Sequence, residues 1–110
     1  MSEPIFYKIH FTETSLKEFK KLGATIQAQF KKKLKTLQSN PHIPSAKLHG
    51  DLSNCYKIKL RSAGYRLVYE VKDDILIIVV IAVAKRQTIY DTAKERLPID
   101  IDNKDKENDN

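Results

Sequence analysis

The segment spanning residues 55–66 constrains the fold more than any other part of the chain. It reads Cys-Tyr-Lys-Ile-Lys-Leu-Arg, then Ser-Ala-Gly, then Tyr-Arg. Side chains on a β-strand alternate between two faces, so this pattern separates an apolar set from a cationic set. The two sets are Tyr56, Ile58 and Leu60 on one face, and Lys57, Lys59 and Arg61 on the other. The apolar set suits a core, and the cations, about 6.6 Å apart along the strand, suit phosphate.

A second strand follows at residues 65–71, and the hydrophobic pattern predicts how the two strands pair. If Leu60 lies opposite Tyr65, apolar residues face each other along the whole hairpin. The same register sets Lys59 opposite Arg66 and adds a fourth cation to the charged face. A slip of one residue would place lysines against core residues, so the pattern favours this register.

The remaining elements are predicted from periodicity and from residues that start or stop helices. Residues 5–11 indicate a first strand, and Thr12 or Thr14 caps a short helix that ends near Gly23. A second helix opens at Thr25 and stops before Pro41, and its apolar residues form a single stripe. That stripe consists of Ile26, Phe30, Leu34 and Leu37.

A third hairpin strand and a final helix complete the chain. The apolar run at residues 75–84 predicts a buried strand after a turn at residues 72–74, and residues 90–97 indicate a last short helix. The order β-α-α-β-β-β-α predicts an α+β fold. We expect an antiparallel sheet with the two N-terminal helices packed on one face and the cationic face open to solvent on the other.

Charge is distributed unevenly along the 110 residues. The net charge is +6, but residues 98–110 contain five acidic residues and two lysines, so residues 1–97 carry +9. We expect residues 1–97 to form one domain and residues 98–110 to be an acidic, disordered tail. A basic domain of this size indicates a polyanionic partner, or an acidic protein that masks it, although a basic surface can also serve solubility alone.

Other sequence features indicate a cytoplasmic protein without cofactors. The single cysteine, Cys55, excludes an intrachain disulfide and suits a reducing compartment. The N-terminus lacks the pattern of a signal peptide, and the longest apolar run, ten residues, is too short to span a bilayer. No spacing of His, Cys and carboxylate residues suggests a metal site, so we expect neither a metal nor an organic cofactor and no association with membranes.

With these elements in place, the chain resembles the RelE-type toxins of bacterial type II toxin–antitoxin systems, within the RelE/ParE superfamily. The resemblance covers residues 6–97 and is densest in four stretches, residues 16–23, 31–34, 55–69 and 83–86. It implies a metal-independent endoribonuclease that cuts messenger RNA in the ribosomal A site. It also implies a RelB-like antitoxin as partner. The toxin would bind operator DNA, and repress the shared promoter, only through that antitoxin.

The resemblance also assigns the functional residues. The catalytic set it implies consists of Lys57, Lys59, Arg66, Arg86 and Tyr90, with Tyr90 stacking on a base of the substrate. The RNA-binding set consists of His49, Arg61 and Lys85. The sequence departs from the best-known member at two places. The segment between Arg86 and Tyr90 is two residues shorter, and His49 replaces an arginine, which makes one phosphate contact weaker or pH-dependent.

The residues themselves indicate how RNA would be cut. Without a metal, the 2′-hydroxyl of RNA attacks the adjacent phosphorus, which requires a base, an acid and cations. The central motif contains no histidine, so Lys59 is the best candidate base because neighbouring cations lower its pKa. Lys57 and Arg66 would stabilise the phosphorane, and Arg86 would orient or help protonate the leaving oxygen, although guanidinium rarely gives up a proton.

Two other functions stay open from the sequence. A ParE-type toxin shares the fold but inhibits DNA gyrase without nuclease activity. A plain nucleic-acid-binding module would bind RNA or DNA in a salt-sensitive manner and release no product with a 2′,3′-cyclic phosphate. In either case Lys57 and Lys59 would be ordinary solvent-facing strand residues, and Tyr90 would pack a helix.

Overall fold

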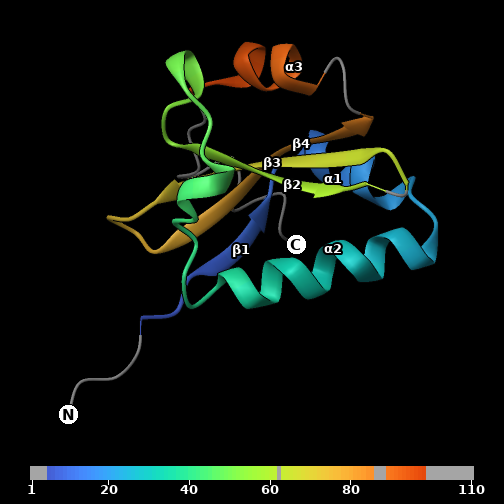
Figure 1. Ribbon diagram of the computed structural model, residues 1–110, viewed down its shortest axis with the longest axis horizontal. Coiled ribbons are helices and arrows are strands. Elements are labelled where there is room, and N and C mark those ends of the chain that lie inside the picture. The colour runs from blue at the N-terminus through green and yellow to red at the C-terminus, as the bar shows by residue number, and fades with distance from the viewer. Residues whose placement is uncertain (1–4, 62, 86–88, 99–110) are drawn as a thin grey trace.

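The computed structural model describes residues 5–61, 63–85 and 89–98, which form one β-sheet with helices on both of its faces (Figure 1). Residues 99–110 of the predicted acidic tail and Arg86 lie outside these residues. The elements, in chain order, are β1 (Lys8–Phe11), α1 (Glu13–Lys20), α2 (Ala24–Leu37), two 3-10 turns (Pro44–Ala46 and Gly50–Leu52), β2 (Cys55–Leu60), β3 (Tyr65–Lys72), β4 (Ile77–Lys85) and α3 (Ile89–Arg96). The predicted α+β class and element order are confirmed.

The sheet has the strand order β1-β4-β3-β2, and its strands are not all antiparallel. Strands β2, β3 and β4 form the predicted antiparallel meander, whereas β1 pairs with β4 in parallel. The reason lies in the connections, because two successive hairpins leave β4 running in the same direction as β2. The α1–α2 crossover between β1 and β2 gives β1 this same direction, as long helical connections between parallel strands do.

The hairpin of β2 and β3 has the predicted register. Leu60 lies opposite Tyr65 and Lys59 lies opposite Arg66, as the hydrophobic pattern required. The turn closes through Gly64, whose backbone N–H donates to the Leu60 carbonyl at 2.9 Å. Its φ of +74° is one that glycine adopts without strain, so a glycine suits this position of the turn.

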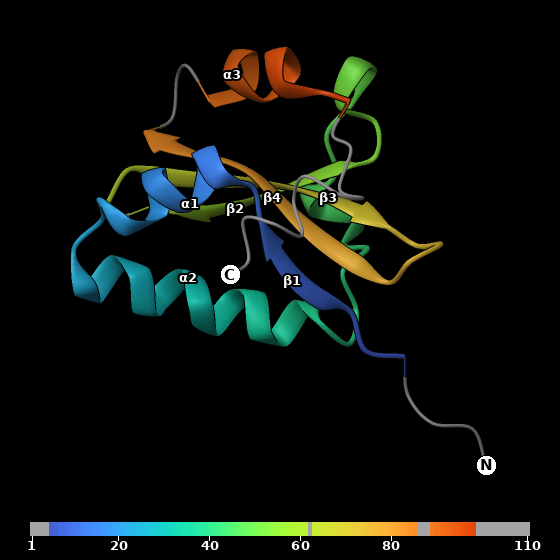
Figure 2. The same cartoon turned by 180° about the vertical axis from the view of Figure 1, so that it is seen from behind.

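Two apolar clusters lie on opposite faces of the sheet. The larger one joins α1 and α2 to the sheet through Phe19, Phe30 and Leu34, and it includes the apolar set of β2. The smaller one lies beneath α3, on the side of the sheet away from α2 (Figures 1 and 2). It consists of Leu52, Cys55, Val68, Ile81, Ala82, Ile89 and Ala93.

The expectation of an open face opposite α1 and α2 was therefore only partly right. Helix α3 packs on β3 and β4 and leaves the cationic residues of β2 at its margin. The cause is the unbroken apolar run of β4, whose residues from Ile78 to Val83 are all buried. A strand that is apolar on both faces requires a cover on both.

Element boundaries lie within a few residues of the predicted ones. Thr12 caps α1, and its hydroxyl accepts a hydrogen bond from the Ser15 N–H at 3.1 Å. Helix α2 begins one residue before the predicted Thr25. Ile75 and Leu76 belong to the β3–β4 turn and are exposed, so the apolar run joins the sheet only from Ile77 onward.

A polar network ties the β3–β4 turn to the loop after α2. The Asp73 carboxylate accepts a hydrogen bond from the Tyr7 hydroxyl and lies 2.7 Å from His42 Nε2. The other imidazole nitrogen of His42 lies 2.7 Å from the Tyr56 hydroxyl. The hydrogen bond from Tyr7, followed by the one with His42, holds the pKa of Asp73 below its usual range.

Replacing Asp73 by asparagine is expected to destabilise the protein more near pH 7 than near pH 3. Because the folded-state pKa is lowered, the stabilisation is present above the unfolded pKa of about 3.9 and is lost as the pH falls through the folded value. Urea unfolding at both pH values measures the loss in the free energy of unfolding. Asp74→Asn, in the same exposed turn, is the control. Equal losses at the two pH values would contradict this role of Asp73.

Candidate active site

Strands β2 and β3 place four cations together, and we call Lys57, Lys59, Arg61 and Arg66 the cationic face. Lys59 and Arg66 are direct cross-strand neighbours, and Lys57 lies opposite Val68, which is fully buried. Lys59 and Arg61 are exposed, whereas Lys57 and Arg66 are half-buried. The alternation predicted from the sequence is thus confirmed, with apolar side chains behind the sheet holding the charged ones toward solvent.

Lys59 lies at the centre of this charge. The positive charge of Lys57 lowers the pKa of Lys59, followed by the charge of Arg66, partial desolvation and the charge of Arg61. Each neighbour disfavours the protonated amine, so a larger fraction of Lys59 is neutral than for an isolated lysine. The exposed position limits the shift because water screens the charges. The direction is the one that a general base requires.

Tyr90, near the start of α3, joins the site from the other side. The Arg66 guanidinium donates a hydrogen bond from Nη1 to the Tyr90 hydroxyl at 3.3 Å. The guanidinium carbon also lies 6.0 Å from the centre of the Tyr90 ring, within the range of a cation–π contact. An aromatic ring and the cationic face therefore lie next to each other, a combination suited to a nucleic-acid base and its phosphate.

Two depressions adjoin the cationic face. One, of about 290 Å³, lies at the hairpin end and is lined by Lys59, Leu60, Arg61, Gly64, Tyr65 and Arg66. The other, of about 380 Å³, runs between α2 and β2, where Lys33 lies along the same groove as Lys57 and Lys59. Lys33 is not among the site residues predicted from the sequence. Only the packing of α2 against β2 brings it to this groove.

The other predicted site residues lie apart from this cluster. His49 is exposed and precedes the second 3-10 turn, next to Leu48, whose N–H bonds to the Cys55 carbonyl. It is thus at the opposite end of β2 from Arg61, a strand length of about 20 Å at 3.3 Å per residue. Lys85 points to the α1–α2 side, where its ammonium lies 5.7 Å from the Tyr65 ring centre. Arg86 lies outside the described residues.

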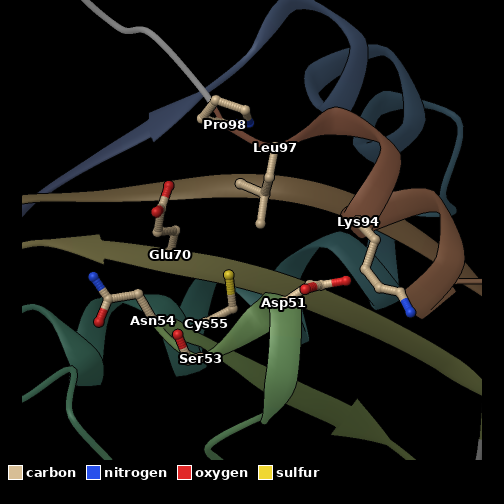
Figure 3. A pocket seen from close by; sticks show the side chains of 8 residues that line it. All are labelled: Asp51, Ser53, Asn54, Cys55, Glu70, Lys94, Leu97 and Pro98. Carbon is tan, nitrogen blue, oxygen red and sulfur yellow. The ribbon is translucent and has the colours of Figure 1, made fainter.

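A further depression, of about 410 Å³, lies where α3 meets the start of β2 (Figure 3). Two carboxylates, Asp51 and Glu70, line it together with one cation, Lys94, so its net charge is negative and does not suit phosphate. Burial, together with the nearby Glu70 charge, raises the pKa of the Cys55 thiol to about 12. Cys55 therefore stays a thiol at neutral pH and serves as a packing residue beneath α3.

The described residues limit the chemistry further. No group of three or more His, Cys, Asp or Glu residues within residues 5–61, 63–85 and 89–98 is placed to hold a metal ion. Nor does any helix in these ranges have the length and apolar character needed to cross a membrane. The cationic face offers charge and one amine of lowered pKa.

Comparison with known proteins gives one family. Residues 9–90 match the family described as ParE toxin of type II toxin-antitoxin system, parDE. A RelE-like toxin protein from Escherichia coli is 56% identical over 93 residues, which span 83% of this chain and 97% of that protein. The mRNA interferase toxin RelE of Escherichia coli is 47% identical over the same shares.

Solved structures agree with the sequence relatives. A mutant of the E. coli toxin RelE in the free state superimposes with a TM-score of 0.77 at 46% identity, covering 84% of this chain and 98% of that one. The toxin in the intact E. coli RelBE toxin-antitoxin complex gives 0.70 at 49% identity, covering 74% and 98%.

Proposed function

The chain belongs to the ParE/RelE family of type II toxin–antitoxin toxins, and we propose that it is an endoribonuclease that cleaves messenger RNA in the ribosomal A site without a metal. The observation that carries the proposal is the position of Lys59 between Lys57 and Arg66, with Tyr90 beside them. Relatives named mRNA interferase support the same activity.

The cationic face can divide the reaction among its members. Neutral Lys59 takes the proton of the 2′-hydroxyl, whose oxygen attacks the adjacent phosphorus. Lys57 and Arg66 stabilise the extra negative charge on the phosphate oxygens. The bond to the 5′-oxygen breaks, and that oxygen takes a proton from solvent water, with Arg86 orienting it or helping to protonate it. The products are a 2′,3′-cyclic phosphate and a 5′-hydroxyl, and Tyr90 stacks on a substrate base.

We further infer that the ribosome positions the substrate. An exposed lysine is mostly protonated at neutral pH even with a lowered pKa, so the site is a weak acid–base catalyst by itself. Holding the 2′-hydroxyl in line with the scissile bond supplies what the site lacks. Arg61 would bind an RNA phosphate beside the cut site, and His49 and Lys85, which lie apart from the cationic face, would bind phosphates farther away and hold the toxin in place.

The stable partner in the cell would be a RelB-like antitoxin, because solved relatives form complexes with such proteins. A helix of the antitoxin that covers the cationic face, or that displaces α3, would block RNA. Repression of the shared promoter would come from DNA contacts of the antitoxin. The protein would act in the cytoplasm, where ribosomes and antitoxin are found.

Inducing the chain alone in bacteria and mapping the 5′ ends of cellular transcripts tests the proposal. New 5′ ends at defined codon positions within translated frames are expected. The family model is named for ParE, so gyrase inhibition is the alternative. Growth arrest with intact transcripts and damaged DNA would favour that alternative, and salt-sensitive RNA binding without cleavage would leave a binding module.

A further inference from the structure

An ion pair with two contact points ties the end of α3 to α1. Arg96, the last residue of α3, donates from Nη1 to Glu18 Oε1 at 3.0 Å and from Nη2 to Glu18 Oε2 at 2.7 Å. Burial alone would raise the pKa of Glu18, but the hydrogen bonds from Arg96 and Val83 outweigh it and hold this pKa below its usual range. The pair links elements 78 residues apart in the chain.

The same two side chains complete the edge of β4. Strand β1 pairs only with Ile77 to Val80, so β4 extends beyond it on that side. Past this point, Arg96 donates to the Ile81 carbonyl at 2.8 Å, and the Val83 N–H donates to Glu18 at 3.0 Å. The Glu18–Arg96 pair thus takes the place of a neighbouring strand and fixes the end of α3 against the sheet.

Helix α3 depends on such external fixing. It has eight residues, a length at which an isolated helix is not stable in water. Ile89 and Ala93, both fully buried, attach one side of it to the sheet. Apolar contacts of this kind tolerate sliding and rotation better than a bidentate pair does, because they lack directional bonds. The Glu18–Arg96 pair therefore adds the directional contact at the C-terminal end.

We propose that Glu18 and Arg96 are positioning residues that hold α3 so that Tyr90 lies over Arg66 in the cationic site. The proposal rests on the proposed nuclease function for its effect on rate. Neither residue touches the cationic face; both act through the helix that carries Tyr90. A shift of the stacking ring by about 1 Å is enough to slow a positioned reaction up to 100-fold.

Replacing Arg96 by methionine tests the proposal in a ribosome-programmed cleavage assay. We expect kcat to fall about tenfold, within the range for misplaced groups, while KM changes little because Lys57 and Lys59 remain. Lys72→Met is the matched control. It removes a partly buried ion pair with Glu70, at 3.5 Å, and its side chain is 23% exposed against 24% for Arg96. Equal losses in the two variants would overturn the proposal.

A double-mutant cycle with Tyr90 separates positioning from stability. In a Tyr90→Ala background, Arg96→Met is expected to cause no further loss of kcat, because the ring it positions is gone. An undiminished tenfold loss in that background would show that the pair acts elsewhere. Glu18→Gln, which keeps the acceptor for Val83, is the second variant should Arg96→Met fold poorly.

An NMR measurement makes the outcome independent of catalysis. Nuclear Overhauser contacts between the Tyr90 ring and the Arg66 side chain are expected in the parent protein and in Lys72→Met, and they should weaken in Arg96→Met. Their persistence in Arg96→Met would overturn the proposal, and so would their loss with unchanged kcat. If the parent chain cuts no RNA, the nuclease function fails, and these contacts alone decide whether the pair positions Tyr90.

Discussion

Replacing Lys59 by alanine is expected to slow cleavage of ribosome-bound messenger RNA about 100- to 10,000-fold, the usual cost of losing a general base. Lys59 is exposed and its neighbours supply the apolar anchor, so the free energy of unfolding should not change measurably. Single-turnover cleavage on programmed ribosomes measures the rate. Lys31→Ala is the control. It also removes one lysine charge, but Lys31 lies on the side of α2 near β1, away from the groove that contains Lys59, so this variant should cleave normally.

The pH dependence distinguishes a base from a phosphate contact. Cleavage by the parent protein should rise with pH, because only the neutral amine of Lys59 accepts a proton. Since the charge of Lys57 is the main cause of the lowered pKa, Lys57→Ala should raise that pKa and move the pH–rate profile to higher pH. Near-full activity of Lys59→Ala, or an unmoved profile in Lys57→Ala, would rule out Lys59 as the base.

Replacing Phe30 by alanine is expected to lower the free energy of unfolding by about 3–5 kcal/mol, as for other buried phenylalanines. Phe30 is completely buried in α2, its ring centre lies 6.5 Å from that of Phe19, and it belongs to the cluster that contains the apolar set of β2. Domains are typically stable by only about 5–15 kcal/mol, so this loss is a large share of the total stability.

Urea denaturation of purified protein provides the measurement for Phe30. Phe6→Ala is the matched control, because the same side chain is 60% exposed there and should contribute little. A loss below about 1 kcal/mol in Phe30→Ala, well under the usual range, would mean that α2 is not packed as described. Phe30→Ala tests the apolar cluster that anchors β2, and Lys59→Ala tests the cationic face on the other side of that strand.

The sequence was sufficient where local pattern and burial agree. Alternation in β2 and β3 predicted the hairpin register, because a slip of one residue would place lysines against core residues. The stripe that includes Phe30 and Leu34 predicted α2, and both residues are buried. The same alternation predicted that Lys57, Lys59 and Arg66 share one face. These features depend on contacts between residues close in the chain.

Features that depend on distant contacts were not predictable in this way. The parallel pairing of β1 with β4 follows from the path of the whole chain, and no local pattern encodes it. The apolar residues on both faces of β4 imply a cover on each face of the sheet, but the sequence interpretation did not predict that α3 covers the second face. Glu18 and Arg96 each read as an ordinary helix-surface charge, and only the fold brings them together.

The sharpest test of the account concerns the nucleophile. In the proposed mechanism the cationic face converges on one phosphate, and the 2′-hydroxyl of the RNA attacks the adjacent phosphorus. A messenger with a single 2′-deoxy nucleotide at the mapped cut site is therefore expected to remain intact on programmed ribosomes, while the same substitution two nucleotides away leaves cleavage unchanged. Continued cutting at the deoxy position would contradict the mechanism.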